Sequence, residues 1–354
     1  MSGHQPPPYG GAQPPTWGGS PPPYGAGWPP PGVPQAPMPA REPAPPLEYH
    51  RILLAGRRGW WRPVLGMLVL GFGWYLVAPF VVLGPFVAWQ VWSGEELGTG
   101  LTGLVDTRNP SPATLAFLLV TLSTAIPICW FIIRVIHGLK PRWLSSVRPR
   151  LRWRFLLICF AVSFATLFMS LLLGALLPGE AVGGEIAEPN PWSSTLRDFV
   201  LVVVFLTPLQ AAAEEYAFRG YLAQAFGGLL NSRVAAVVGP ALLFALAHGI
   251  GQSLPIFFDR FAFGLVAGVL VLATGGLEAA IAMHVLNNWL AFGLAVAFFD
   301  LGDALNPTGG SWWDILVTVF KSVTYLALAL WVARSMGLDR RTSPAVLEAS
   351  RGRV

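Results

Sequence analysis

The side chains suited to hydrolytic chemistry gather in the second half of a very apolar chain. Residues 211–222, AAAEEYAFRGYL, place two carboxylates and an arginine between apolar runs. Residues four apart share one face of an α-helix, so Glu215 and Arg219 are expected to pair, while Glu214 points about 100° away. An ionisable group inside a membrane span costs about 2.5 to 3.5 kcal/mol and by default indicates function. Glu214 is therefore expected to be the carboxylate that stays free of this pair.

Further polar side chains interrupt the apolar runs downstream. His248 follows the run ALLFALA, with Phe244 four residues before it on the same face, and His284 and Asn288 are also four apart. A carboxylate, two imidazoles and an amide from three helices could hold and activate a water molecule and stabilise an oxyanion. Taken singly, each has a structural alternative: a Glu–Arg packing clamp, an interfacial histidine or a staple between helices. The other polar residues of these runs are Glu278 and Asn287.

The three motifs together resemble the CPBP family of intramembrane proteases, also called the Abi or CAAX-protease family. They are EExxxR starting at Glu214, FxxxH ending at His248, and HxxxN from His284 to Asn288, in family order. The resemblance covers about residues 196–295 and implies a peptide-bond hydrolase with its active site inside the membrane. The family includes the CAAX prenyl endopeptidases, but the Pro-, Gly-, Ala- and Arg-rich composition is typical of a high-GC bacterium, where prenylated substrates are not expected.

The resemblance also implies roles for individual residues. Glu214 would deprotonate the attacking water, His248 would orient or activate that water, and His284 with Asn288 would stabilise the oxyanion. Glu215 and Arg219 would hold the helix that carries Glu214. A glutamate-dependent mechanism without a cofactor is favoured, and the chain has no HExxH motif. The alternative is a zinc site formed by Glu214, His248 and His284, since one carboxylate and two imidazoles with an open position suit zinc.

The composition predicts an all-α protein, a polytopic bundle of about eight transmembrane helices. Of the 354 residues, 54% are hydrophobic and only 12% are charged, whereas about a quarter of the residues of a soluble domain are charged. A span needs about 20 apolar residues of helix. The expected spans are residues 64–92, 113–136, 155–177, 199–219, 234–250, 261–274, 277–298 and 313–335.

The distribution of charge predicts the orientation. Lys and Arg gather in residues 51–62, 140–154 and 340–341, whereas the loops between them are acidic. Basic loops stay on the cytoplasmic side, so both termini are expected there, in a multi-pass plasma-membrane protein. Basic residues confined to loops do not form the folded basic face that nucleic acid requires. The expected partners are the lipid bilayer and a membrane-embedded or membrane-associated peptide or protein substrate.

The N-terminal region differs from the rest of the chain. Seventeen of the 33 prolines fall in residues 1–50, a composition that cannot bury enough apolar surface to fold. We expect a disordered cytoplasmic tail there, either a solvated tether or a ligand for a partner that binds Pro-rich segments. The remaining expected divisions are N-terminal transmembrane helices at 51–195, a catalytic core at 196–295, a last helix at 296–336 and a basic cytoplasmic tail at 337–354.

Two questions stay open at this point. Placed simply, the fifth span puts His248 near the outer surface, whereas Glu214 and His284 lie in the cytoplasmic half. The leading function is an intramembrane endopeptidase, and the alternative is a non-proteolytic scaffold, immunity protein or proton-coupled transporter that uses the same polar residues.

Overall fold

The computed structural model describes residues 45–94, 97–176, 188–249, 251–307, 309 and 312–351. These residues belong to a compact unit, Pro43–Val354. The expected N-terminal tail lies outside the described residues as far as residue 44.

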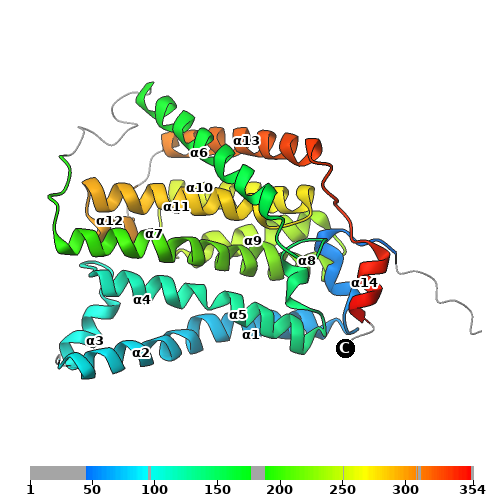
Figure 1. The fold of residues 1–354 in the computed structure, drawn as a ribbon, viewed down its shortest axis with the longest axis horizontal. Coiled ribbons are helices and arrows are strands. Elements are labelled where there is room, and N and C mark those ends of the chain that lie inside the picture. Colours follow the sequence, from blue (N-terminus) through cyan, green and yellow to red (C-terminus); the bar gives the residue numbers. More distant parts are fainter. Residues whose placement is uncertain are drawn as a thin grey trace, which may run out of the picture. The chain divides into compact units, whose positions relative to one another are not determined.

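Helices account for nearly all of the regular structure in the described part of the chain, which contains two isolated β-bridges and no strand (Figure 1). Seven helices are long and apolar enough to cross a membrane, and α9 (Arg233–Ala247) is a shorter apolar helix. The expected all-α membrane bundle is therefore confirmed. The seven long helices are Trp61–Ser93, Pro112–Ile136, Trp153–Leu176, Ser194–Leu230, Leu254–Thr274, Glu278–Phe298 and Ile315–Ser335.

Several long helices are composite, because short π-helical segments join regular α-helices. The first contains α1 (Trp61–Phe72), a π segment (Gly73–Val77) and α2 (Ala78–Ser93). The second contains α4 (Pro112–Ser123), α5 (Ala125–Phe131) and a π segment (Ile132–Ile136). The fourth contains α7 (Ser194–Glu214), a π segment (Glu215–Leu222) and α8 (Ala223–Leu230). The others are α6 (Trp153–Leu176), α10 (Leu254–Thr274), α11 (Glu278–Phe298) and α13 (Trp312–Ser335).

Small side chains allow the central helices to approach closely. Helix α11 packs against α6, α7 and α10, and α10 packs against α9 and α13. A Cβ on Gly264 or Gly268 would lie about 3.0 Å from atoms of α9, so these glycines bring α9 and α10 together. Without a hydrophobic driving force between helices in lipid, such close packing is the main source of association.

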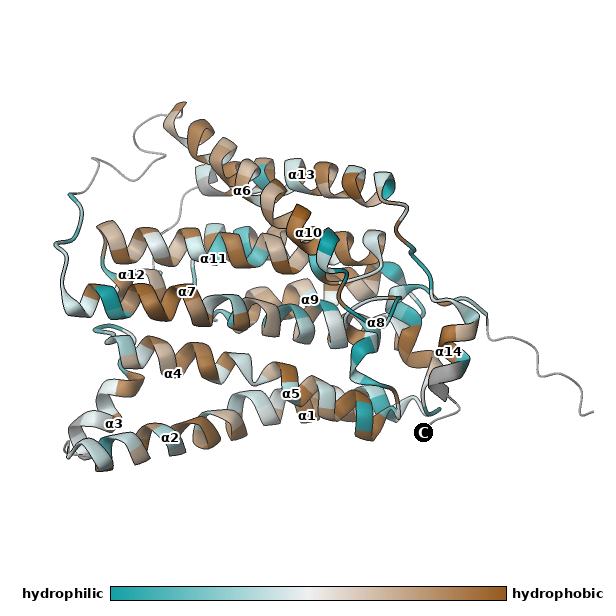
Figure 2. Ribbon diagram, viewed as in Figure 1, coloured by the Kyte–Doolittle hydropathy of each residue, from teal (hydrophilic) through white to brown (hydrophobic). Residues whose placement is uncertain are grey.

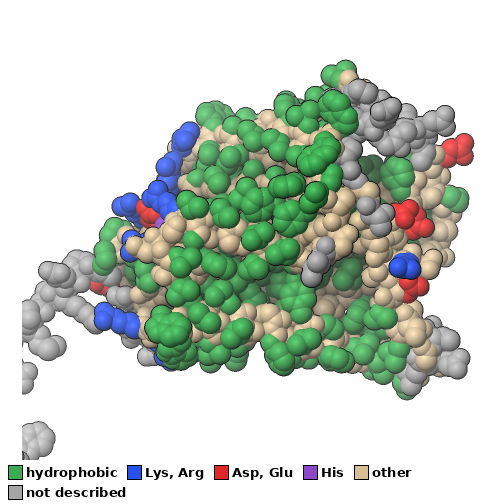
Figure 3. Space-filling model, turned by 180° about the vertical axis from the view of Figure 1, so that it is seen from behind, with side chains coloured by type: hydrophobic (Ala, Val, Ile, Leu, Met, Phe, Trp, Pro, Cys, Tyr) green, Lys and Arg blue, Asp and Glu red, His purple; other side chains and the backbone are tan. Residues whose placement is uncertain are grey.

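The surface agrees with a multi-pass membrane protein. Apolar residues dominate the helices, and hydrophilic residues concentrate near their ends (Figure 2). Seen from behind, the helices carry a broad hydrophobic surface, with Lys and Arg at one end and Asp and Glu at the other (Figure 3). Large apolar side chains such as Leu68, Phe80 and Phe164 are 65%, 75% and 66% exposed, as lipid-facing residues would be.

Both expected tails are partly folded onto the basic end of the bundle. The 3-10 segment Tyr49–Ala55 is buried at Tyr49 and His50, and the C-terminal helix α14 (Pro344–Arg351) buries Leu347. Parts of both segments are thus attached to the bundle. The sequence did not indicate these anchors, because each is short and depends on contacts with distant residues.

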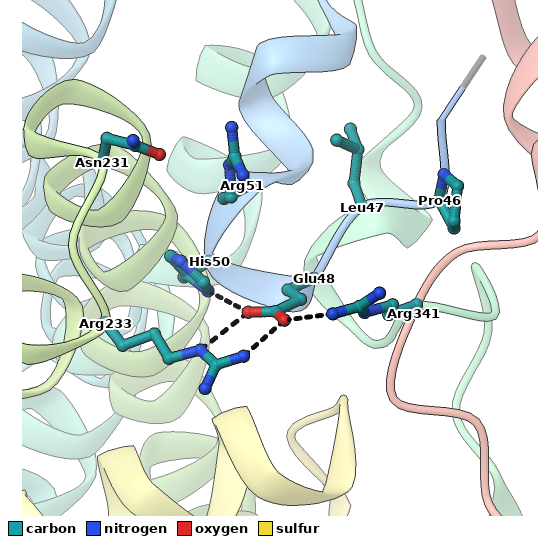
Figure 4. A pocket seen from close by; sticks show the side chains of 8 residues that line it. All are labelled: Pro46, Leu47, Glu48, His50, Arg51, Asn231, Arg233 and Arg341. Carbon is teal, nitrogen blue, oxygen red and sulfur yellow. Dashed lines mark hydrogen bonds and ion pairs between the residues drawn. The ribbon is translucent and has the colours of Figure 1, made fainter.

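Glu48 joins three segments at this end (Figure 4). Its carboxylate accepts hydrogen bonds from Arg233 at the start of α9, with Nε at 2.8 Å, and from Arg341 at 3.0 Å, beside a pocket of about 370 Å³. Hydrogen bonding by Arg233, and then by Arg341, lowers the pKa of Glu48 from 4.5 to about 2 against the opposing effect of burial. Glu48 thus connects the segments around residues 48 and 341 to α9, the helix that leads to His248.

Candidate active site

The EExxxR motif lies where α7 changes into a π-helical segment. Glu214 is the last residue of α7 and Glu215 is the first of the π segment. The expected pair forms, since Nη1 of Arg219 donates to Oε1 of Glu215 at 2.8 Å and both side chains are almost completely buried. π-helical turns are frequent at functional sites. The local pairing predicted from the four-residue spacing is therefore confirmed.

His284 lies between the two glutamates. Its Nδ1 is 2.7 Å from Oε1 of Glu215, and its Nε2 is 3.4 Å from Oε2 of Glu214. A neutral imidazole has one donor and one acceptor, whereas ionised carboxylates only accept. Nδ1 of His284 therefore donates to Glu215. The contact with Glu214 is longer, and Oε2 of Glu214 accepts no hydrogen bond from the described residues.

Glu215 thus has a second partner that the sequence did not indicate. The four-residue spacing led us to expect a pair with Arg219, and the contact with His284 lies 69 positions away in the chain. Glu215 fixes the tautomer and orientation of His284, which leaves Nε2 of the ring facing Glu214.

His248 occupies the C-cap of α9 and reaches the same cavity. Its Nδ1 lies 2.8 Å from the carbonyl oxygen of Phe244, so Nδ1 carries the proton and Nε2 can accept. Gly249 follows with φ at +119°, a conformation that side-chain-bearing residues rarely adopt, and turns the chain away directly after the histidine. The FxxxH spacing therefore sets the ring through a bond to the backbone of its own helix.

Phe244 packs against both imidazoles and the arginine of this site. Its ring lies 4.6 Å from the ring of His248 and 5.8 Å from that of His284, centroid to centroid. The guanidinium carbon of Arg219 lies 4.3 Å from the Phe244 centroid, a cation–π contact. Phe218 and Phe263 extend this aromatic layer. The layer shields the charged groups from lipid and holds both imidazoles in place.

The predicted residues line one cavity of about 560 Å³ between the helices. Glu214, His248, His284 and Asn288 all contribute to its wall. Glu214 and His284 are 6% and 2% exposed, whereas His248 is open to the cavity. The cavity continues along α11 past Asn288 to Phe292 and α12 (Leu301–Leu305). No hydrogen bond joins Asn288 to His284, both of which the structure describes; Nδ2 of Asn288 donates to Oε1 of Gln210 at 3.1 Å.

The chemistry requires His248 at the depth of Glu214, and the structure places both on one cavity, so the expected bounds of the fourth and fifth spans were wrong. The fourth helix does not end near residue 219 but continues to Leu230, and α9 starts at Arg233 beside it. Leu230 follows Glu214 by 16 positions and His248 follows Arg233 by 15, which is about 24 and 22 Å at about 1.5 Å per residue. The long helix and the short helix that returns beside it therefore bring both side chains to the same depth.

Glu278 is not part of this cavity. Its Oε1 accepts from the backbone nitrogen and Nε of Arg152 at 2.8 and 2.9 Å, and its Oε2 accepts from Nη2 at 2.6 Å. Arg152 also donates to the carbonyl oxygen of Thr274. This buried pair attaches the basic loop to the first turn of α11. Arg152, expected only as a signal of orientation, is thus a structural residue.

Several polar groups near the cavity were not expected from the sequence. Gln210, Asp259 and Arg260 line it, and Lys321 of α13 donates to Oδ1 of Asn287 at 2.6 Å. Arg260 donates to Gln252 at 2.9 Å. Lys321 had a clear signal, because it is the single charged residue of the mainly apolar run 315–333. Gln210 could have been found from its place four residues before Glu214.

The positions of the possible donor atoms do not favour the alternative zinc site. Within the described residues no three side chains of His, Cys, Asp or Glu lie close enough together to hold a metal ion. Glu214 and His284 approach to 3.4 Å, whereas no ion pair joins the described residues His248 and Glu214. This arrangement does not fit a tetrahedral zinc site.

Comparison with known proteins supports the resemblance. Residues 196–290 match the family described as type II CAAX prenyl endopeptidase Rce1-like. The uncharacterized protein YyaK of Bacillus subtilis (strain 168) is 22% identical over 222 residues, which cover 58% of this chain and 71% of YyaK. No solved structure matches. The resemblance to the CPBP, or CAAX-protease, family is confirmed over the segment that carries Glu214, His248, His284 and Asn288.

Proposed function

From this resemblance to CAAX-type intramembrane proteases, we propose that the protein is an endopeptidase that hydrolyses a peptide bond of a membrane-associated peptide or protein. One observation carries the proposal: Glu214, His248, His284 and Asn288, taken from three helices, line a single cavity. Residues 196–295 form the catalytic core, flanked by the helices of 51–195 and 296–336. We also propose a plasma-membrane location with both termini cytoplasmic, which the segregation of charge supports.

In the proposed reaction, Glu214 acts as the general base. A water molecule in the cavity donates to the Glu214 carboxylate and to Nε2 of His248, which accepts because its Nδ1 is bonded to Phe244. The water attacks the substrate carbonyl carbon as its proton moves to Glu214, and the carbonyl becomes an oxyanion. Glu214 then transfers this proton to the leaving amine, the C–N bond breaks, and the carboxylate is regenerated.

The oxyanion is stabilised by groups that are already in place. His284, whose ring is held by Glu215, and Asn288, through its amide NH₂ group, stabilise the oxyanion. Donors fixed in a site without bulk water need no reorganisation during the reaction, which is why they lower the barrier. Catalysis by glutamate predicts activity that survives a chelator; loss of activity with a chelator and its recovery with zinc would support the metal alternative.

The test compares the membrane proteomes of cells that carry the wild-type protein, Glu214→Gln or Asp339→Asn. Asp339 is a surface partner of Arg148 remote from the cavity, so its variant is the matched control for loss of one carboxylate. The proposal expects at least one membrane protein or peptide to be shortened in cells with wild-type or Asp339→Asn protein and intact with Glu214→Gln. Equal peptide lengths in all three, at equal protein abundance, would refute the endopeptidase.

A scaffold or proton-coupled transporter is the alternative, favoured by the polar connection from Lys321 through Asn287 and Asn288 to Gln210. For that function, Glu214→Gln would change partner binding or proton-linked transport while leaving all peptide lengths unchanged.

A further inference from the structure

Helices α7 and α11 face each other through two polar contacts one turn apart. Glu214 meets His284 at 3.4 Å, and Gln210 meets Asn288 at 3.1 Å. From the first contact to the second, the residue number decreases by four on α7 and increases by four on α11, so the two helices are antiparallel. Nε1 of Trp289 donates to the carbonyl oxygen of Val203 at 3.1 Å and holds this register. All four polar side chains of the two contacts line the cavity.

The orientation of the amides is determined by Lys321. Its ammonium group can only donate, and it lies 2.6 Å from Oδ1 of Asn287, so Nδ2 of Asn287 must face the other way. That Nδ2 lies 3.5 Å from Oδ1 of Asn288, a long contact with matched polarity. Asn288 then presents Nδ2 to Oε1 of Gln210. Each amide orients the next, and a flipped amide would place two donors or two acceptors together.

The end of this series is the NH₂ group of Gln210. Gln210 is only 4% exposed and lines the cavity, and the described part of the chain offers its Nε2 no acceptor. This nitrogen is not among the enclosed polar atoms that lack a partner, so it is accessible from the cavity and can donate to a group bound there. Gln210 lies one turn from Glu214 on the same face of α7, at about 5 to 6 Å between Cβ atoms.

We propose that Gln210 is a second oxyanion donor beside Asn288, and that Lys321 is the positioning residue that keeps the Gln210 NH₂ directed into the cavity. The inference rests on the proposed endopeptidase function and deepens it. A carbonyl attacked by water at Glu214 places its oxygen toward the neighbouring contact, where Gln210 and the second hydrogen of the Asn288 amide donate to it. The donors act on charge that develops in the transition state, so they increase kcat with little effect on KM.

The test measures kcat and KM with a quenched fluorogenic peptide in phosphatidylcholine vesicles, copied from the cleavage site mapped in the proteome comparison. Gln210→Met removes the amide at similar volume, and Gln210→Glu keeps the acceptor for Asn288 while removing the donor. Both are expected to lower kcat by about 10²–10³-fold at similar KM. Lys321→Met is expected to lower kcat in the same way, Lys321→Arg to retain most of it, and Ser322→Ala, the buried neighbour on α13, to leave it unchanged.

The double variant Gln210→Met with Lys321→Met separates positioning from general damage. If Lys321 acts through Gln210, the double variant is no slower than Gln210→Met, because residues that work as one unit are not additive. The inference would be overturned if the kcat losses of the two single variants multiplied in the double variant. It would also be overturned if only KM changed, or if Gln210→Glu kept the wild-type kcat. The Gln210→Glu result decides the question even if Lys321→Met does not fold. If wild-type protein cleaves and Glu214→Gln does not, such results refute only this inference; without Glu214-dependent cleavage, the proposed function fails with it.

Discussion

Two buried glutamates, Glu214 and Glu278, show how differently the same side chain is held within one bundle. Glu278 is fully buried, and both of its oxygens accept hydrogen bonds from Arg152. Glu214 lines a cavity, and its Oε2 accepts no hydrogen bond from the described residues, with His284 at 3.4 Å as its ion-pair partner. Burial alone therefore does not indicate chemistry, whereas a buried carboxylate with unused bonding capacity beside a cavity does.

The largest effect expected from this comparison is on catalysis by Glu214. Glu214→Gln removes the proposed base at nearly constant shape, so kcat should fall by about 10²–10⁴-fold, with little change in thermal stability. The measurement is cleavage of the fluorogenic peptide by purified protein, with the unfolding temperature recorded alongside. A variant that loses stability but keeps its rate per folded molecule would place Glu214 with the structural residues.

Glu278 should show the opposite behaviour. Glu278→Gln leaves the buried Arg152 without its counter-charge, so the free energy of unfolding should fall by about 3–5 kcal/mol, while folded molecules keep their rate. Combining Glu278→Gln with Arg152→Met should restore part of this loss, because no buried charge then lacks a partner. The measurement is unfolding in detergent micelles. A drop in kcat without a drop in stability would contradict the structural role of Glu278.

A smaller effect is expected at the surface glutamate Glu48. Its pKa of about 2 lies below the usual 4.5, so its contribution is present at neutral pH and is lost as the pH falls from about 4.5 toward 2. Because this carboxylate is partly solvated, the contribution at neutral pH is at most about 1 kcal/mol. Wild-type protein should unfold at a higher temperature than Glu48→Gln at pH 7, and the difference should shrink below pH 4.5. A difference independent of pH would assign the effect to packing.

The spans were predicted best where a long apolar run ends at a charge or a turn. The span expected at 113–136 is the helix Pro112–Ile136, and that expected at 277–298 is Glu278–Phe298. The span expected at 199–219 is part of a helix from Ser194 to Leu230, because the polar EExxxR motif resembles the end of a span when it is in fact enclosed by other helices. Because the fourth span was ended too early, the span bounds conflicted with the depth that the chemistry requires for His248.

The amino-acid sequence by itself determined the membrane bundle, the pairing of Glu215 with Arg219 and four of the side chains that line the cavity. These features depend on hydropathy, helical spacing and the family motifs, which are local along the chain. Tertiary structure alone decided that Glu215 also holds His284, that Arg152 satisfies Glu278 across 126 positions, and that Lys321 orients an amide series ending at Gln210. The physical reason is that a hydrogen bond between distant residues depends on how far each helix extends and which faces meet, and no spacing within one helix contains that information.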